Sequence, residues 1–214
     1  MKELEKPGMS EEKEGLCRLQ KEDISKAVSV LVDAFQHDPI WNKIFEHVSW
    51  SAPKLSAFFE IPIRYCLHYG EVRATSKSLE GIAAWLPGNL AEMSFWRLIR
   101  SGAIRSGMKI GFKLGKKMKP VYRPLEEDRN RNMEGRSFIY LQIIGVATAH
   151  QRKGFGSKLL ETIIEQSERI GIPIYLETET EINVAIYEKF GFKLIKRIVL
   201  PEIELPMWEM VREA

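Results

Sequence analysis

Cysteine is scarce in this sequence of 214 residues, with only Cys17 and Cys66, far apart and in apolar surroundings. Two such cysteines do not make a disulfide framework, so we expect free thiols and a reducing, cytoplasmic setting. Histidine is nearly as scarce, and its four residues are scattered. Because these residues do not show the spacing of metal ligands, we expect no metal site.

Long apolar runs are also missing. No stretch approaches the roughly 18 consecutive apolar residues of a membrane-spanning helix, and residues 1–6 lack the apolar centre of a signal peptide. Hydrophobic residues make up 44% and charged residues 29% of the chain, which is ordinary for a soluble globular protein. The length suits one domain with a sizeable core.

Acidic residues are absent between Met93 and Leu125, where every charged residue is basic. Apolar residues are interleaved with the basic ones, and three interpretations stay open: a helical insertion with one buried stripe, a surface that attracts an anionic ligand, or a contact with nucleic acid or a membrane surface. The net charge of the whole chain is only +3, so the basic patch is local and we expect no nucleic-acid partner. The basic residues are Arg97, Arg100, Arg105, Lys109, Lys113, Lys116, Lys117, Lys119 and Arg123.

The most informative stretch is the hexapeptide Gln-Arg-Lys-Gly-Phe-Gly at residues 151–156. The apolar run at 138–146 predicts a strand before it, and the amphipathic run at 157–169 predicts a helix after it. Such a loop leaves backbone N–H groups free at a helix N-terminus, where the helix dipole also favours an anion. The pattern therefore predicts a phosphate or pyrophosphate site, in which Gly154 and Gly156 let the ligand approach the main chain.

Two known phosphate-binding motifs do not fit this chain. Leu159 stands where the dinucleotide fingerprint needs its third glycine. The stretch at 111–117 is one residue shorter than a Walker A motif and lacks the Ser or Thr that would hold magnesium. The loop at 151–156 therefore belongs to another class of anion site.

The residues after the loop predict three more elements: a buried strand at 174–178, a short helix at 182–190 and a strand at 192–200. Asn183 and Tyr187 are four residues apart and so lie on one face of that helix. Together, the loop, the buried strand and the Asn…Tyr…Gly-Phe segment resemble the GNAT superfamily of N-acetyltransferases. The loop matches the superfamily signature Gln/Arg-x-x-Gly-x-Gly/Ala, and the resemblance is strongest over residues 138–192.

The resemblance implies an α/β (mixed α+β) fold with a central twisted mixed sheet of about six or seven strands, flanked by helices. The periodicity of the N-terminal half fits the order that the superfamily places first, with a strand at 16–19, helices at 21–35 and 51–69, and a strand pair at 71–75 and 81–86. We expect a flexible N-terminus at 1–14 and a single domain at 15–214. Within the domain, we expect an N-terminal half (15–88), a basic helical insertion (89–136) and an acetyl-CoA-binding half (137–214).

Acetyl-CoA is the co-substrate that the resemblance implies. Superfamily members splay two neighbouring parallel strands apart and hold the pantetheine arm between them, and here these strands would be 138–146 and 174–178. Gly145 would fit a β-bulge in the first of them. The contacts that the resemblance implies are the backbone of Ile144 and Val146, the loop residues Gln151, Arg152, Lys153, Gly154, Phe155, Gly156 and Ser157, and the side chains of Asn183 and Tyr187.

Tyr187 is the implied catalytic acid, because a phenol with a pKa of about 10 stays protonated at neutral pH and can donate to a leaving thiolate. Many superfamily members carry a base Glu on the strand before the loop, but this chain offers only Gln142 there. Glu177 is the best remaining carboxylate for the base, and Glu179 is the second.

The acceptor is expected to be an amine of a small molecule or a peptide, and we hypothesise that the basic segment lies over its site. The alternative is a non-catalytic module that binds acyl-CoA as a sensor or interaction protein. Superfamily members often form dimers, so a homodimer is one option, to which the apolar tail around residues 206–208 would contribute.

Overall fold

The computed structural model describes residues 16–45 and 52–214. The flexible N-terminus predicted for residues 1–14 lies outside these residues. The N-terminal half follows the predicted order with one additional helix. Its elements are β1 (Cys17–Arg18), a 3₁₀ turn (Lys21–Asp23), α1 (Ile24–Phe35), α2 (Pro39–Phe45), α3 (Ala52–Tyr69), β2 (Glu71–Ala74) and β3 (Gly81–Pro87).

The helix α2 was not expected, because His37-Asp38-Pro39 predicts a break. The break is a single turn in which the Asp38 carboxylate accepts a hydrogen bond from the N–H of Ile40 at 3.0 Å. A new helix then begins at Pro39. Proline is well placed in a first helical turn, since its missing N–H would have no helical partner there.

The basic insertion forms three helices: α4 (Phe95–Arg100), α5 (Ile104–Ile110) and α6 (Phe112–Asn132). Gly102 and Gly111 separate them, with positive φ values of 73° and 86° that L-residues rarely adopt. On α6 the buried residues Leu114, Met118 and Val121 are spaced by four and three positions. This is the buried stripe that was predicted as one of three interpretations of the insertion.

The C-terminal half alternates strands and helices until its last two strands, which pair with each other. The elements are β4 (Ile139–Val146), a 3₁₀ turn (Thr148–His150), α7 (Phe155–Ile170), β5 (Ile174–Thr178), α8 (Glu181–Lys189), β6 (Lys193–Leu200) and β7 (Leu205–Arg212). The predicted helix at 157–169 in fact begins two residues earlier, directly after Gly154.

The strand β7 was not predicted, and it changes the interpretation of the C-terminal tail. All seven strands form one mixed sheet in the order β1-β2-β3-β4-β5-β7-β6, so β7 inserts between β5 and β6. Met207 and Trp208 are accordingly buried inside the chain, at 4% and 6% exposure. They do not form an exposed apolar surface for a homodimer.

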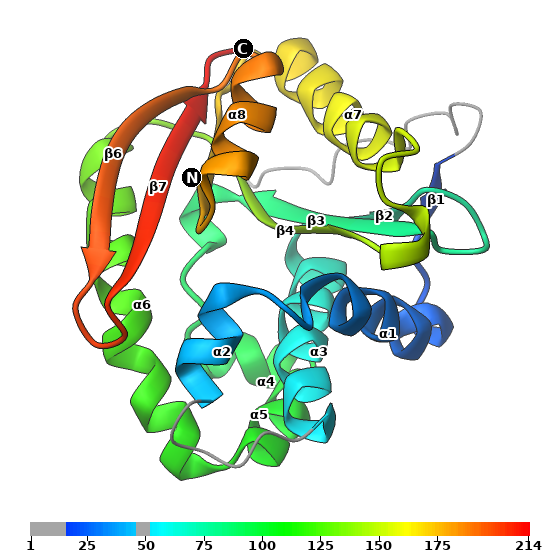
Figure 1. Cartoon of the computed structure of the whole chain (residues 1–214), viewed down its shortest axis with the longest axis vertical. Helices are drawn as coiled ribbons and strands as arrows, with labels where there is room; N and C mark the ends of the chain where they lie inside the picture. Colours follow the sequence, from blue (N-terminus) through cyan, green and yellow to red (C-terminus); the bar gives the residue numbers. More distant parts are fainter. Residues whose placement is uncertain (1–15, 46–51) are drawn as a thin grey trace.

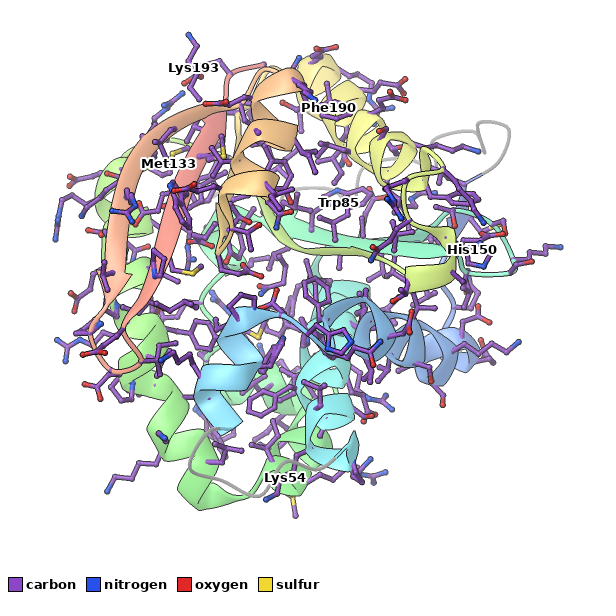
Figure 2. The ribbon with its side chains drawn as sticks, in the orientation of Figure 1. Lys54, Trp85, Met133, His150, Phe190 and Lys193 are labelled. Carbon is purple, nitrogen blue, oxygen red and sulfur yellow. The ribbon has the colours of Figure 1, made fainter. Side chains whose placement is uncertain are left out.

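Helices cover both faces of the sheet, with α7 and α8 above the central strands and α1, α2 and α3 below them in Figure 1. Each face has its own apolar core: one contains side chains of α1, α3, α5 and α6, and the other side chains of α7. Trp85 lies in the middle of the sheet on the α7 side (Figure 2), where its indole N–H donates to Gln166 of α7 at 2.8 Å. The predicted α/β class and strand number are confirmed.

A β-bulge was predicted at Gly145 of β4, and this prediction was wrong, because the bulge lies elsewhere in the strand. Gly145 pairs regularly with Ile82. The register shifts instead between Ala84 and Trp85 of β3, which pair with Ile143 and Leu141, so Gln142 is the additional residue. Gly145 has a different role: a Cβ at this position would lie 2.8 Å from the Phe35 ring and 3.0 Å from Leu31. Glycine here lets α1 pack closely on β4.

Among the described residues, no helix combines the length and apolar character that crossing a bilayer would need.

The variant Gly145→Ala should be destabilised by about 1–3 kcal/mol, because its Cβ overpacks the contact between α1 and β4. Gly115→Ala is a matched control, since a Cβ there meets nothing within 4 Å and alanine is the better helix former by up to about 1 kcal/mol. Urea denaturation measures both variants. Equal stabilities for Gly145→Ala and the wild type would contradict the packing role of Gly145.

Candidate functional site

The parallel strands β4 and β5 are joined only at their beginnings. Two register pairs connect them, Ile139 with Ile174 and Tyr140 with Tyr175. Beyond these pairs β4 continues to Val146, paired with β3, and β5 continues to Thr178, paired with β7. The two parts of the sheet therefore diverge after Tyr140, and the facing edges of β4 and β5 no longer bond each other. This is the splay that the family resemblance implies.

The bulge at Gln142 decides which β4 groups face the gap. Before the bulge, the side chain of Ile139 points to the α7 face of the sheet and its N–H donates to Pro173 on the β5 side, at 2.8 Å. After the bulge, the even-numbered residues Ile144 and Val146 point to the α7 face. Side-chain direction and N–H direction alternate together along a strand, so the N–H groups of these two residues face the gap.

The direction of the N–H groups on the β3 side of β4 agrees with this assignment. The N–H of Ala147 donates to the carbonyl oxygen of Glu80, next to β3, at 2.9 Å. Its neighbour Val146 must then direct its N–H towards β5. Backbone donors without a strand partner require another acceptor, and a ligand lying along the gap would supply one.

The predicted anion loop leads directly from β4 into α7. Gly154 adopts a left-handed conformation with φ of 85° as the N-cap of α7, and Arg152 also has a positive φ, of 60°. A Cβ on Gly154 would meet no atom within 4 Å, and one on Gly156 would meet only Val146, at 3.7 Å. Among the described residues, the space above Gly154 is thus open and that above Gly156 is bordered only by Val146, beside the N-terminus of a helix of 16 residues.

The loop side chains brace the loop rather than fill this space. Gln151 donates from its amide to the carbonyl oxygen of Val146 at 3.2 Å, and the Lys153 ammonium donates to the carbonyl oxygen of Ala149 at 2.8 Å. The ring of Phe155 lies edge-on to His150, with centroids 5.9 Å apart, and His150 marks the start of the loop in Figure 2. Arg152 is exposed and Ser157 is half-buried in the first turn of α7.

The predicted residues of α8 lie next to the end of β5. Thr180 caps the helix by accepting the N–H of Asn183 at 3.2 Å. The Asn183 amide in turn donates to the hydroxyl of Thr178, the last residue of β5, at 3.0 Å. One turn further, Tyr187 is half-buried against the α7-side core, with its ring 5.5 Å from Phe192. Burial raises the pKa of the Tyr187 phenol, and the charge of Glu179 raises it further.

Comparisons with known proteins agree with this geometry. A family model described as an acetyltransferase (GNAT) domain matches residues 121–194. An uncharacterized N-acetyltransferase of Schizosaccharomyces pombe is 30% identical over 205 residues, covering 92% of this chain and 82% of that protein. The chain belongs to the GNAT family of N-acetyltransferases.

Solved structures show the same fold at lower identity. A histone acetyltransferase HPA2 and related acetyltransferase from Corynebacterium glutamicum superposes with a TM-score of 0.63 at 21% identity, covering 94% of this chain and 96% of that one. The polyamine N-acetyltransferase of Drosophila melanogaster gives a TM-score of 0.64 at 11% identity, covering 93% and 99%. These likenesses support the GNAT fold and leave the acceptor to be argued from this chain.

Glu177, the predicted base, is held in a buried ion pair on the helical-insertion side of this GNAT sheet. Arg129 of α6 donates to it at 2.8 Å, with side-chain exposures of 8% and 6% for the two residues. The hydroxyl of Tyr140 donates to its other oxygen at 2.5 Å. Burial raises the pKa of Glu177, while Arg129 and Tyr140 oppose that shift. A carboxylate bound at both oxygens is poorly available as a base.

Glu209 of β7 forms a second buried acidic group nearby. It has no exposed surface, and one oxygen accepts from Asn132 of α6 at 2.7 Å and from Tyr175 of β5 at 2.9 Å. Its other oxygen has no hydrogen-bond partner among the described residues. Burial raises the pKa of Glu209 to about 7, and the charges of Asp128 and Glu177 act in the same direction.

The structure thus brings the predicted β4, loop and α8 residues around one gap, and adds a set of residues that the sequence analysis missed. The missed residues come from α6 and β7, outside the loop and the Asn…Tyr segment, so no local pattern indicated them. In the described part of the chain, no three His, Cys, Asp or Glu side chains gather where they could hold a metal ion. The missed residues are Arg129, Asn132 and Glu209.

The raised pKa of Glu209 predicts that stability falls as pH rises from about 4.5 to about 7, because the native state holds a proton that the unfolded chain has released. Glu209→Gln should remove this loss, which amounts to about 3 kcal/mol, and should shrink the difference in unfolding free energy between pH 5 and pH 8. Urea denaturation at both pH values measures it. Glu188→Gln, on the exposed face of α8, is the control. An unchanged difference in Glu209→Gln would show that Glu209 is ionised throughout.

Proposed function

We propose that this GNAT protein transfers the acetyl group of acetyl-CoA to a primary amine of a small molecule or peptide. The observation that supports the proposal most is the gap between β4 and β5, with two backbone N–H groups directed into it and the α7 N-terminus beside it. Acetyl-CoA suits both features, because it has an extended arm with a thioester at one end and a diphosphate at the other. Because the bound group would hydrogen-bond to backbone, the site needs few special side chains.

The fit to acetyl-CoA can be described residue by residue. In this proposal the N–H groups of Ile144 and Val146 hold the pantetheine amides and polarise the thioester carbonyl. The α7 loop binds the diphosphate, mainly through backbone N–H groups that the two glycines leave accessible. The residues of this loop are Gln151, Arg152, Lys153, Gly154, Phe155, Gly156 and Ser157.

Tyr187 is the proposed general acid. Its raised pKa keeps the phenol protonated at neutral pH, and a thiolate with a pKa near 8.5 is basic enough to accept a proton from a donor held against it. Asn183 helps to position Tyr187 indirectly, since its hydrogen bond to Thr178 fixes the first turn of α8 to the end of β5. The role of Asn183 in contacting the cofactor stays a prediction.

A base is still required, because an alkylammonium with a pKa of about 10.4 costs roughly 4.6 kcal/mol to deprotonate at neutral pH. Glu177 was the first prediction for this role and stays a prediction. Its ion pair with Arg129 argues against it, since a proton there would weaken a buried salt bridge.

Calorimetric titration with acetyl-CoA, free CoA and dephospho-CoA tests the proposal. We expect saturable binding of one acetyl-CoA per chain. Tyr187→Phe should keep that affinity while kcat falls by 10-fold or more, about 1.4 kcal/mol or more of transition-state stabilisation. Tyr69→Phe is the matched control, because the buried hydroxyl of Tyr69 has no hydrogen-bond partner in the part of the chain that the structure describes.

The outcomes are distinguishable. No binding of acetyl-CoA in folded protein would contradict the proposal. Binding without turnover would favour the alternative, an acyl-CoA sensor on the same scaffold. An unchanged kcat in Tyr187→Phe would remove Tyr187 from the mechanism and leave the cofactor site in place.

A further inference from the structure

Four large apolar side chains are exposed on the first two helices of the insertion. Three of them belong to α4 and the fourth belongs to α5. The exposed fractions are 60% for Phe95, 71% for Trp96, 40% for Ile99 and 74% for Met108. The rings of Phe95 and Trp96 lie edge to face, with centroids 5.7 Å apart. Apolar side chains that gather outside the core on one segment indicate an interaction surface.

The helix α5 has one face towards the core and one towards solvent. Three exposed residues follow the spacing i, i+3 and i+4, which places them on one side of a helix. They are Arg105, Met108 and Lys109. The buried positions are Ala103, Ser106 and Ile110, and α5 packs on α3. Met108 is therefore flanked by basic side chains on the solvent face.

Contacts with α3 also fix the position of α4. The hydroxyl of Tyr65 donates to the carbonyl oxygens of Leu90 at 2.8 Å and Glu92 at 3.2 Å, just before α4 begins. Arg97 of α4 donates to the same Glu92 carbonyl oxygen at 3.2 Å. The two helices contact each other and lie at the end of the molecule opposite α7 and α8 in Figure 1. The exposed apolar residues thus stand on a fixed base.

The charges beside these apolar residues are all positive. Every charged residue of α4 and α5 is basic. Within residues 16–45 and 52–214, the one ion pair made by either helix joins Lys109 to Glu60 of α3, at 3.5 Å. Arg100 and Arg105 are exposed, and their charges have no acidic partner among these residues. An anionic surface is the partner that complements this charge.

A pocket beside α5 adds a place for an anionic group. It has a volume of about 350 Å³ and is lined by Glu60, Arg64, Gly102, Arg105 and Lys109. Its one carboxylate, Glu60, is already bound by Arg64 at 2.7 Å and by Lys109. Three cations against one carboxylate leave the lining with an excess of positive charge. This lining suits a phosphate head group.

We propose that the outward faces of α4 and α5 form a docking surface for an anionic membrane. Trp96, Ile99 and Met108 enter the lipid interface, while Arg100 and Arg105 bind lipid phosphates. This inference goes beyond the proposed function and does not depend on it. The contact is peripheral, because helices of six and seven residues are far shorter than the roughly 20 residues that cross a bilayer.

The composition of this surface favours lipid over nucleic acid. Tryptophan and phenylalanine beside Lys and Arg are typical of segments that lie in the membrane interface. Ile99 and Met108 lack the aromatic face on which an unpaired base stacks, but they gain from leaving water for hydrocarbon. Arg and Lys side chains can keep their charged ends at the head groups while their stems lie along apolar surface.

The test is sedimentation of the full chain with vesicles. One set contains phosphatidylcholine alone, and the other contains equal parts of phosphatidylcholine and phosphatidylserine. We expect binding to the anionic vesicles that weakens as salt is raised, and much weaker binding to the neutral ones. Trp96→Ser and Met108→Ser should each weaken anionic binding about 5-fold or more. Arg100→Gln and Arg105→Gln should each weaken it about 5-fold.

Two exposed residues at the end of α7 provide matched controls. Ile170→Ser and Arg169→Gln should bind vesicles as the wild type does. Urea midpoints confirm that all variants fold, and titration with acetyl-CoA should give the wild-type affinity in each of the four surface variants. That titration is a separate measurement, so failed vesicle binding leaves the proposed acetyltransferase function standing.

Several outcomes would overturn the membrane assignment. One is equal binding to both vesicle types or no binding to the anionic ones. Another is anionic binding that the four surface variants leave unchanged, or that the two α7 controls weaken as much. Random-sequence duplex DNA is tested alongside, and a chain that binds this DNA but not the vesicles would use the surface for nucleic acid instead.

Discussion

The divergence of two parallel strands after Tyr140 and Tyr175 is the constraint on which the candidate site depends. Several contacts hold it in place. Each strand stays fully paired on its outer side, the bulge at Gln142 sets which N–H groups of β4 face the gap, and the Tyr140 hydroxyl reaches across to Glu177 just where the ladder ends. Backbone donors then face an open edge within a rigid sheet. This arrangement explains how a strand that reads as merely apolar can carry the proposed binding of acetyl-CoA.

The helical insertion connects to this constraint from the other face of the sheet. Its last helix, α6, sends Arg129 to Glu177 on β5 and Asn132 to Glu209 on β7. The helical insertion (89–136) is therefore tied to β5 and β7 through the C-terminal half of α6. This supports the hypothesis that the insertion shapes the acceptor site.

Much of this arrangement was predictable from the sequence, and the exceptions have physical causes. The loop at 151–156 and the Asn183–Tyr187 spacing are local patterns, so they indicated the family and the cofactor half. The bulge position was not predictable, because Gly145 fits a bulge by its flexibility although the structure uses it for contact with α1. Glu177 appeared to be a free carboxylate, since its partner Arg129 lies 48 residues away in sequence. The acceptor site was not predictable, because acidic residues such as Asp38 are too ordinary in the sequence to assign.

The most direct test of the account is hydrogen exchange of the backbone amides with and without acetyl-CoA, read by mass spectrometry on short peptides. If acetyl-CoA lies between β4 and β5 with its diphosphate at the α7 N-terminus, peptides covering residues 141–147 and 151–157 should exchange more slowly when it is bound. Peptides of β6, at the far edge of the sheet, should not change. Binding of acetyl-CoA without protection of residues 141–147 would contradict the claim that the split strands form the site.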